Sequence, residues 1–116
     1  MDESGSVDGI LNWDQLREIT TNDPDLMREI VAMLIDDTSR QMQLLDAAIR
    51  ERDAPQCMRL AHYSKGACAN VGANSAAALF KRIEGGASSG DFAGCGSAFA
   101  ALSQEIALLR AAAVNI

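Results

Sequence analysis

The sequence predicts an all-α protein, an antiparallel up-and-down four-helix bundle with a short extra helix at its N-terminal end. The 116 residues are rich in Ala and Leu and only 4% aromatic, a composition that favours packed helices over a sheet. Cap residues mark the starts of helices along the chain, and apolar residues recur between them at helical spacing. A chain of this length forms one domain. We expect residues 1–10 to be a disordered lead-in and residues 11–116 to be the domain.

The first two helices have recognisable N-terminal caps. Asn12 can cap a short helix over residues 13–20. Asp23 is followed by proline at the first helical position, where the missing N–H has no cost, and this pair begins a long helix over residues 24–52.

The third helix is predicted over residues 54–71. Asp53 and Gln56 form a capping-box pattern at its start, with the Gln56 side chain expected to reach back to the cap. Either Gly72 or Asn74 is expected to form the turn that ends this helix.

Two more helices complete the pattern. The stretch "SAAALFKRIE" forms the fourth helix and ends near "GGASSG", and Asp91 caps a last helix that continues through "FAALSQEIALLRAAA". Four substantial helices joined by short loops must be antiparallel neighbours, which gives the bundle.

Charge and composition exclude several classes of protein. A net charge of −6 argues against nucleic acid or an anionic membrane as the main partner. The longest apolar run, residues 30–35, is far too short to span a membrane, and the chain does not open like a signal peptide. Three cysteines, Cys57, Cys68 and Cys95, are interpreted as core-filling thiols in a reducing cytoplasm. With one histidine, no zinc or other metal site is expected.

The single histidine, His62, is predicted to face solvent. It lies about 150° from the centre of the apolar stripe on the third helix. That stripe consists of Cys57, Leu60, Ala61, Ser64, Ala67, Cys68 and Val71. Arg59 and Lys65 lie three positions to either side of the histidine, and Gly66 lies four positions after it.

Gly66 is the unexpected residue in this stretch. A glycine inside a helix costs about 1 kcal/mol relative to alanine, so the close approach of another backbone or of a ligand is the usual reason for one. An exposed imidazole, cations that can hold a phosphoryl group and room for a partner together indicate a site of histidine phosphorylation.

The stretch resembles the signature of histidine-containing phosphotransfer (HPt) domains. In that family His-x-x-Lys-Gly is followed by a glycine six residues further, here His62, Lys65, Gly66 and Gly72. The flanking stretches "DPDLMREIVAMLIDDT", "AAIRERDAPQCMRLAH" and "LFKRIEGGASSGD" are also similar to the family, so the resemblance covers roughly residues 12–110.

The resemblance implies a role for each matching residue. His62 would accept a phosphoryl group from the aspartyl phosphate of a receiver domain and pass it to another receiver. Lys65 would lie near the phosphate, with Arg59 beside it. Gly66 and Gly72 would leave space for the receiver.

Two further positions follow from the same comparison. Glu84 occupies a place where members often have Glu or Gln, and it would accept a hydrogen bond from the histidine Nδ1–H and so orient the ring. Its other interpretation is a solvated charge on an exposed face. Tyr63 departs from the small or polar residue of many members, which would alter the choice of partner more than the chemistry.

The expected division of chemistry makes this chain a relay intermediate and not an enzyme. It has no Gly-rich phosphate loop and no Walker lysine, so no ATP site or kinase activity is expected. The receiver is expected to supply the aspartate and Mg²⁺, and the chain to have no cofactor of its own. We expect a cytoplasmic monomer kept soluble by its charge.

A docking patch is one interpretation of the long second helix. It has more apolar residues than one stripe requires, notably Val31, Met33, Ile35 and Met42. The other interpretation is a broad buried face that also covers the short first helix.

Three alternatives remain at this stage. One is an adaptor bundle in which His62 has no chemistry. Another is the dimerisation domain of a sensor kinase, against which Tyr63 and the lack of a proline after Pro55 argue. The third is an HPt domain phosphorylated directly by a kinase ATP-binding domain. The sequence does not specify the receivers, the direction of transfer, the output, or whether the domain belongs to a hybrid kinase.

Overall fold

The computed structural model describes residues 10–116 and confirms the all-α prediction. Helices α2 to α6 span, in order, Trp13–Ile19, Pro24–Arg50, Ala54–Val71, Asn74–Ser89 and Phe92–Ala113. No strand occurs in residues 10–116. The predicted lead-in falls almost entirely on residues outside this range. Its last residue, Ile10, is half-buried against the core.

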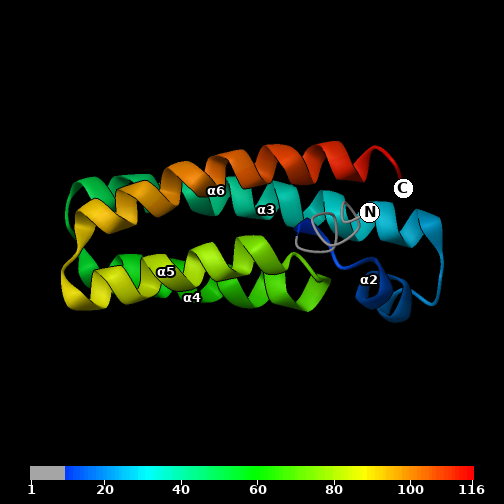
Figure 1. The fold of residues 1–116 in the computed structure, drawn as a ribbon, viewed down its shortest axis with the longest axis horizontal. Helices are drawn as coiled ribbons and strands as arrows, with labels where there is room; N and C mark the ends of the chain where they lie inside the picture. The colour runs from blue at the N-terminus through cyan, green and yellow to red at the C-terminus, as the bar shows by residue number, and fades with distance from the viewer. Residues whose placement is uncertain (1–9) are drawn as a thin grey trace, which may run out of the picture.

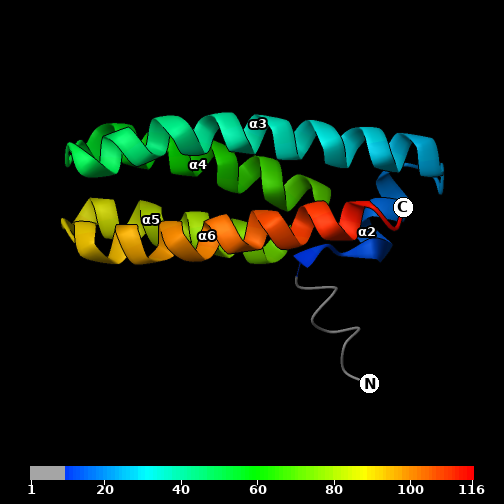
Figure 2. The same cartoon turned by 90° about the horizontal axis from the view of Figure 1, so that it is seen from above.

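The four long helices lie side by side, and successive helices run in opposite directions (Figure 1). Helix α4 packs against α3 and α5, while α6 packs against the other sides of the same two helices. The short helix α2 lies at one end of the molecule and packs against α4 (Figure 2). The arrangement places α4 and α5 next to each other along their whole length.

The helices begin where the sequence predicts. Asn12, Asp23, Asp53 and Asp91 all occupy the N-cap, and each side chain accepts a hydrogen bond from a backbone N–H of the first turn. The predicted reciprocal bond of the capping box is absent, because the Gln56 side chain accepts a hydrogen bond from Arg59 instead.

Gly72, and not Asn74, forms the turn between α4 and α5. It has a left-handed backbone with φ of 95°, and its carbonyl accepts a hydrogen bond from the Asn12 N–H at 2.8 Å. A Cβ at Gly72 would lie 3.1 Å from the Asn12 carbonyl oxygen. Because Gly72 is buried and is needed for this turn, the expectation that it gives a receiver access is wrong.

The core confirms one prediction and corrects another. All three cysteines are free and buried, as expected of core-filling thiols, and burial raises the pKa of Cys68 to about 11. Two members of the expected docking patch are also core residues, since Val31 is 0% exposed and Met42 is 9% exposed. Helix α3 packs against both α4 and α6, so its buried face is wide enough to include both.

By length and composition alone, α6 could cross a membrane. In the structure it packs against α3 and α5, and five of its residues are buried there, namely Cys95, Ala98, Leu102, Ile106 and Leu109. A core helix of a soluble protein passes the same composition test, so this finding is weak evidence for a membrane segment.

We predict opposite stability effects for alanine at two glycines. Gly72→Ala should lower the free energy of unfolding by about 1–3 kcal/mol, because alanine is strained at positive φ and its Cβ would press on Asn12. Gly96→Ala should raise it by about 0.5–1 kcal/mol, because that Cβ meets no atom within 4 Å in the helix interior. Urea unfolding measures both changes, and equal effects would contradict the prediction.

Candidate functional site

His62 projects from the outer face of α4, as the helical wheel predicts. Its side chain is 69% exposed, while the opposite stripe of the same helix is buried against its neighbours. The buried residues of that stripe are Cys57, Leu60, Ala61, Ser64 and Cys68. Packing of the stripe therefore fixes the direction in which the imidazole points.

Glu84 connects the imidazole to a lysine. Its Oε2 lies 3.1 Å from His62 Nδ1, and its Oε1 accepts a hydrogen bond from Lys65 Nζ at 2.9 Å. The lysine is one turn after His62 on α4, and the glutamate reaches both from α5. The antiparallel packing of these two helices thus brings the three side chains together.

The carboxylate of Glu84 determines which nitrogen of the neutral His62 ring has the proton. The hydrogen bond from Lys65 is the largest influence and holds the pKa of the Glu84 carboxyl below its ordinary value, with His62 adding to the effect and burial opposing it. An ionised carboxylate can only accept hydrogen bonds, so the neutral imidazole has its proton on Nδ1. Nε2 then has the lone pair and makes no hydrogen bond within residues 10–116.

Nothing in the described chain explains Gly66. A Cβ built at this position meets no atom within 4 Å, in contrast to Gly72, where it would press on Asn12. The space beside His62 is therefore open to solvent. No packing contact within residues 10–116 requires a glycine at position 66.

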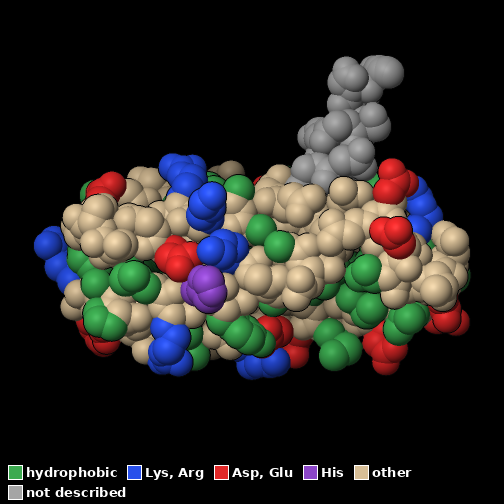
Figure 3. All heavy atoms as spheres, turned by 90° about the horizontal axis from the view of Figure 1, so that it is seen from below, with side chains coloured by type: hydrophobic (Ala, Val, Ile, Leu, Met, Phe, Trp, Pro, Cys, Tyr) green, Lys and Arg blue, Asp and Glu red, His purple; other side chains and the backbone are tan. Residues whose placement is uncertain are grey.

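Cations gather on the two helices that form the site. Helices α4 and α5 contain four Lys and Arg residues and one acidic residue, Glu84, although the whole chain has a net charge of −6. Figure 3 shows several Lys and Arg side chains near His62, the one purple side chain. Arg59 is exposed, but it bonds to Gln56 and the structure does not bring it into contact with the imidazole.

A groove between α3 and α4, beside the histidine, was missed by the sequence analysis. It has a volume of about 560 Å³, and its lining combines six apolar or aromatic side chains with four charged or polar ones, namely Asp36, Asp37, Arg40 and Asn70. Met33 is 65% exposed, and Tyr63, which also lines the groove, is 53% exposed. Met33 is thus the one member of the expected docking patch that lies here, since Ile35 is half-buried towards α6. The sequence signal that could have indicated this groove was Tyr63, a large aromatic residue directly after the exposed histidine.

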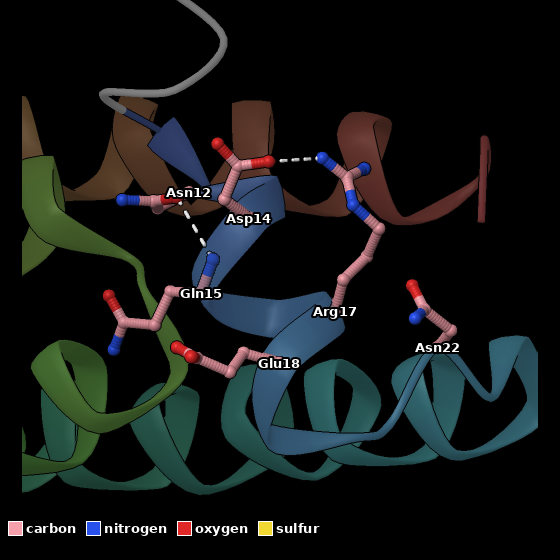
Figure 4. Close-up of a pocket in the computed structure, with 6 residues that line it drawn as sticks. All are labelled: Asn12, Asp14, Gln15, Arg17, Glu18 and Asn22. Atoms are coloured by element: carbon pink, nitrogen blue, oxygen red, sulfur yellow. Dashed lines mark hydrogen bonds and ion pairs between the residues drawn. The ribbon is translucent and has the colours of Figure 1, made fainter.

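A larger hollow of about 650 Å³ lies on α2 (Figure 4). Four of the six side chains that line it have structural partners within the described residues. Asp14 pairs with Arg17, Asn12 caps the helix, and Gln15 donates a hydrogen bond to the Ala69 carbonyl at 2.7 Å. This hollow therefore serves the attachment of α2. Across residues 10–116 no three His, Cys, Asp or Glu side chains lie close enough together to hold a metal ion.

Comparisons with known proteins concern the family and the fold of this chain. The model of the Hpt domain family matches residues 29–112. The chain also resembles the crystal structure of histidine-containing phosphotransfer protein B (HptB) from Pseudomonas aeruginosa PAO1, with a TM-score of 0.83 and 23% sequence identity over 91% of this chain and 92% of that chain. At this identity the likeness concerns the fold alone. No curated protein matches the sequence.

We predict that Glu84 makes the free energy of unfolding depend on pH in the acid range. A carboxyl whose pKa is lowered on folding adds stability above its unfolded pKa, about 4.3, and loses it as the pH falls through the lower folded pKa. Wild type should exceed Glu84→Gln by about 0.5–1 kcal/mol at pH 7, and the difference should shrink below pH about 4.3. Urea unfolding at several pH values measures this. Glu29→Gln, an exposed glutamate on α3, is the control, and parallel curves for wild type and Glu84→Gln contradict the prediction.

Proposed function

The chain belongs to the Hpt domain family, whose members are phosphotransfer modules that work with receiver domains. From that premise we propose that His62 accepts a phosphoryl group from the aspartyl phosphate of one receiver and transfers it to the aspartate of another. The observation that supports this most strongly is the exposed imidazole with Nδ1 held by an ionised Glu84.

The chemistry follows from that hydrogen bond. The Nε2 lone pair attacks the phosphorus, and the bond from phosphorus to the aspartyl oxygen breaks, so the electron pair leaves with the receiver carboxylate. The Nδ1 proton stays on the ring, which becomes positively charged. The Glu84 carboxylate, 3.1 Å from Nδ1, stabilises that charge as it forms. Transfer to the second receiver reverses these steps.

Lys65 supplies the charge for the phosphoryl group. Its ammonium donates a hydrogen bond to Glu84 Oε1 at 2.9 Å, one turn from the imidazole. A phosphoryl group on Nε2 would be a second anion near this ammonium, after the Glu84 carboxylate. Arg59, on the other side of His62 along α4, adds longer-range attraction. Gly66 leaves the approach to the nitrogen open.

The receiver would supply the remaining catalytic groups. We expect the aspartate and a Mg²⁺ ion to come from it, with no cofactor on this chain. A cytoplasmic monomer remains our expectation. The excess of cations on α4 and α5 is complementary to an acidic receiver site.

The groove between α3 and α4 is the docking surface that we propose for the receiver. Its wall on α4 includes Tyr63, the residue directly after His62, and its exposed apolar residues, chiefly Met33 and Tyr63, offer a contact outside the core. It replaces the patch expected from the sequence, half of which is buried.

The central test is phosphotransfer to His62. We expect a receiver phosphorylated with acetyl phosphate to add one phosphoryl group to the wild-type chain, measured by intact mass and lost in acid, and none to His62→Gln. Circular dichroism serves as the folding control. If neither a panel of receivers nor an ATP-binding kinase domain gives an adduct while the chain is folded, the adaptor interpretation is correct. If only an ATP-binding kinase domain labels His62, the chain is the kinase-phosphorylated type of HPt domain.

A charge in the groove should weaken docking. We predict that Met33→Glu raises the KM for a receiver about tenfold, because it replaces an exposed apolar contact with a third carboxylate beside Asp36 and Asp37, which costs hydration when a receiver covers it. Leu108→Glu is the matched control, since Leu108 is an exposed residue of α6, which packs on α3 and α5. Equal KM values for the two variants would contradict the docking surface.

A further inference from the structure

Tyr63 makes a contact that the phosphotransfer chemistry does not use. Its hydroxyl donates a hydrogen bond to Asp37 Oδ2 at 2.9 Å, which connects α4 to α3. The hydrogen bond to Asp37, followed by the negative charge of that carboxylate, raises the pKa of Tyr63, so the hydroxyl remains a donor at neutral pH.

Asp37 is itself held in place. Its Oδ1 lies 3.7 Å from the Arg40 guanidinium one turn further along α3, and its side chain is 27% exposed. The carboxylate therefore has a cation on one oxygen and the tyrosine hydroxyl on the other. This arrangement gives the half-exposed Tyr63 ring one directional contact, which favours the position that the ring has here.

The two neighbours on α4 are fixed from opposite sides. His62 is held by Glu84 of α5, and Tyr63 is held by Asp37 of α3. Consecutive residues of a helix are 100° apart, so the tyrosine ring stands between the histidine and the groove without contacting Glu84 through its hydroxyl. The reacting nitrogen and the wall of the groove are thus positioned by separate contacts.

We propose that Tyr63, positioned by Asp37, is a specificity-determining residue that selects which receivers can dock beside His62. The proposal rests on the proposed function, because it concerns the partner of that same site. A ring that is already fixed loses little entropy when a fitting receiver packs against it. A receiver whose docking segment does not fit must break the hydrogen bond between Tyr63 and Asp37 to move the ring aside, and that cost discriminates between partners.

The test is a specificity profile measured on the full chain. Receiver domains from one genome are phosphorylated with acetyl phosphate, and kcat and KM for transfer are measured with wild type, Tyr63→Phe, Tyr63→Ala and Asp37→Ala. Asp46→Ala is the matched control, because it removes a carboxylate that pairs with an arginine of the same helix outside the groove. Labelling by phosphoramidate, which needs no protein partner, reports the reactivity of His62.

We expect Tyr63→Ala to raise the KM of the preferred receiver about tenfold and to lower the ratio of kcat/KM between preferred and other receivers by a similar factor. Tyr63→Phe and Asp37→Ala should each lower that ratio about threefold, since both remove the hydrogen bond that holds the ring while an aromatic ring stays at position 63. Asp46→Ala should retain the wild-type ratio. kcat should change less than twofold throughout.

Three results overturn the proposal. An unchanged ratio in Tyr63→Ala shows that the ring does not select partners. Equal losses for every receiver, accompanied by a lower unfolding free energy in Tyr63→Phe, show a structural role. Slower labelling by phosphoramidate shows a role in the reactivity of His62. Failure of the proposed function is distinct, because then the wild-type chain is labelled by phosphoramidate and by no receiver.

Discussion

The packing of α4 against α5 is the constraint on which the site depends. It places one carboxylate, Glu84, between an imidazole and an ammonium that share a helix face. Lys65 lowers the pKa of that carboxyl further below neutral, and the ionised carboxylate accepts a hydrogen bond from Nδ1 of the neutral His62 ring. A change in the register of the two helices by one residue would rotate Glu84 by 100° and separate all three groups.

The groove depends in the same way on the packing of α4 against α3. Tyr63 and Asp37 are 26 positions apart in the sequence, and they meet because these helices are antiparallel neighbours. Helix α4 therefore has its reactive nitrogen positioned by a contact with α5 and its groove-lining tyrosine positioned by a contact with α3. Such a separation lets the partner surface change without moving the imidazole.

Local signals explain what the sequence predicted well. Caps such as Asp23 and Asp91 act within one turn, and the exposure of His62 follows from the stripe of its own helix, so both are readable from a short window. The burial of Val31 and Met42 could not be predicted from a short window, because the width of the buried face of α3 depends on how many helices pack against it. The Tyr63–Asp37 contact depends on register between helices, which no local pattern encodes.

The two glycines of the signature illustrate the same limit. The family signature assigned both of them room for a receiver, but Gly72 is required by a left-handed turn and by the nearby Asn12 backbone, whereas Gly66 borders open space. A helix-interior glycine costs about 1 kcal/mol, and for Gly66 no contact within residues 10–116 offsets this cost. The room beside Gly66 lies on the exposed side of α4 near His62, where the proposed receiver would approach.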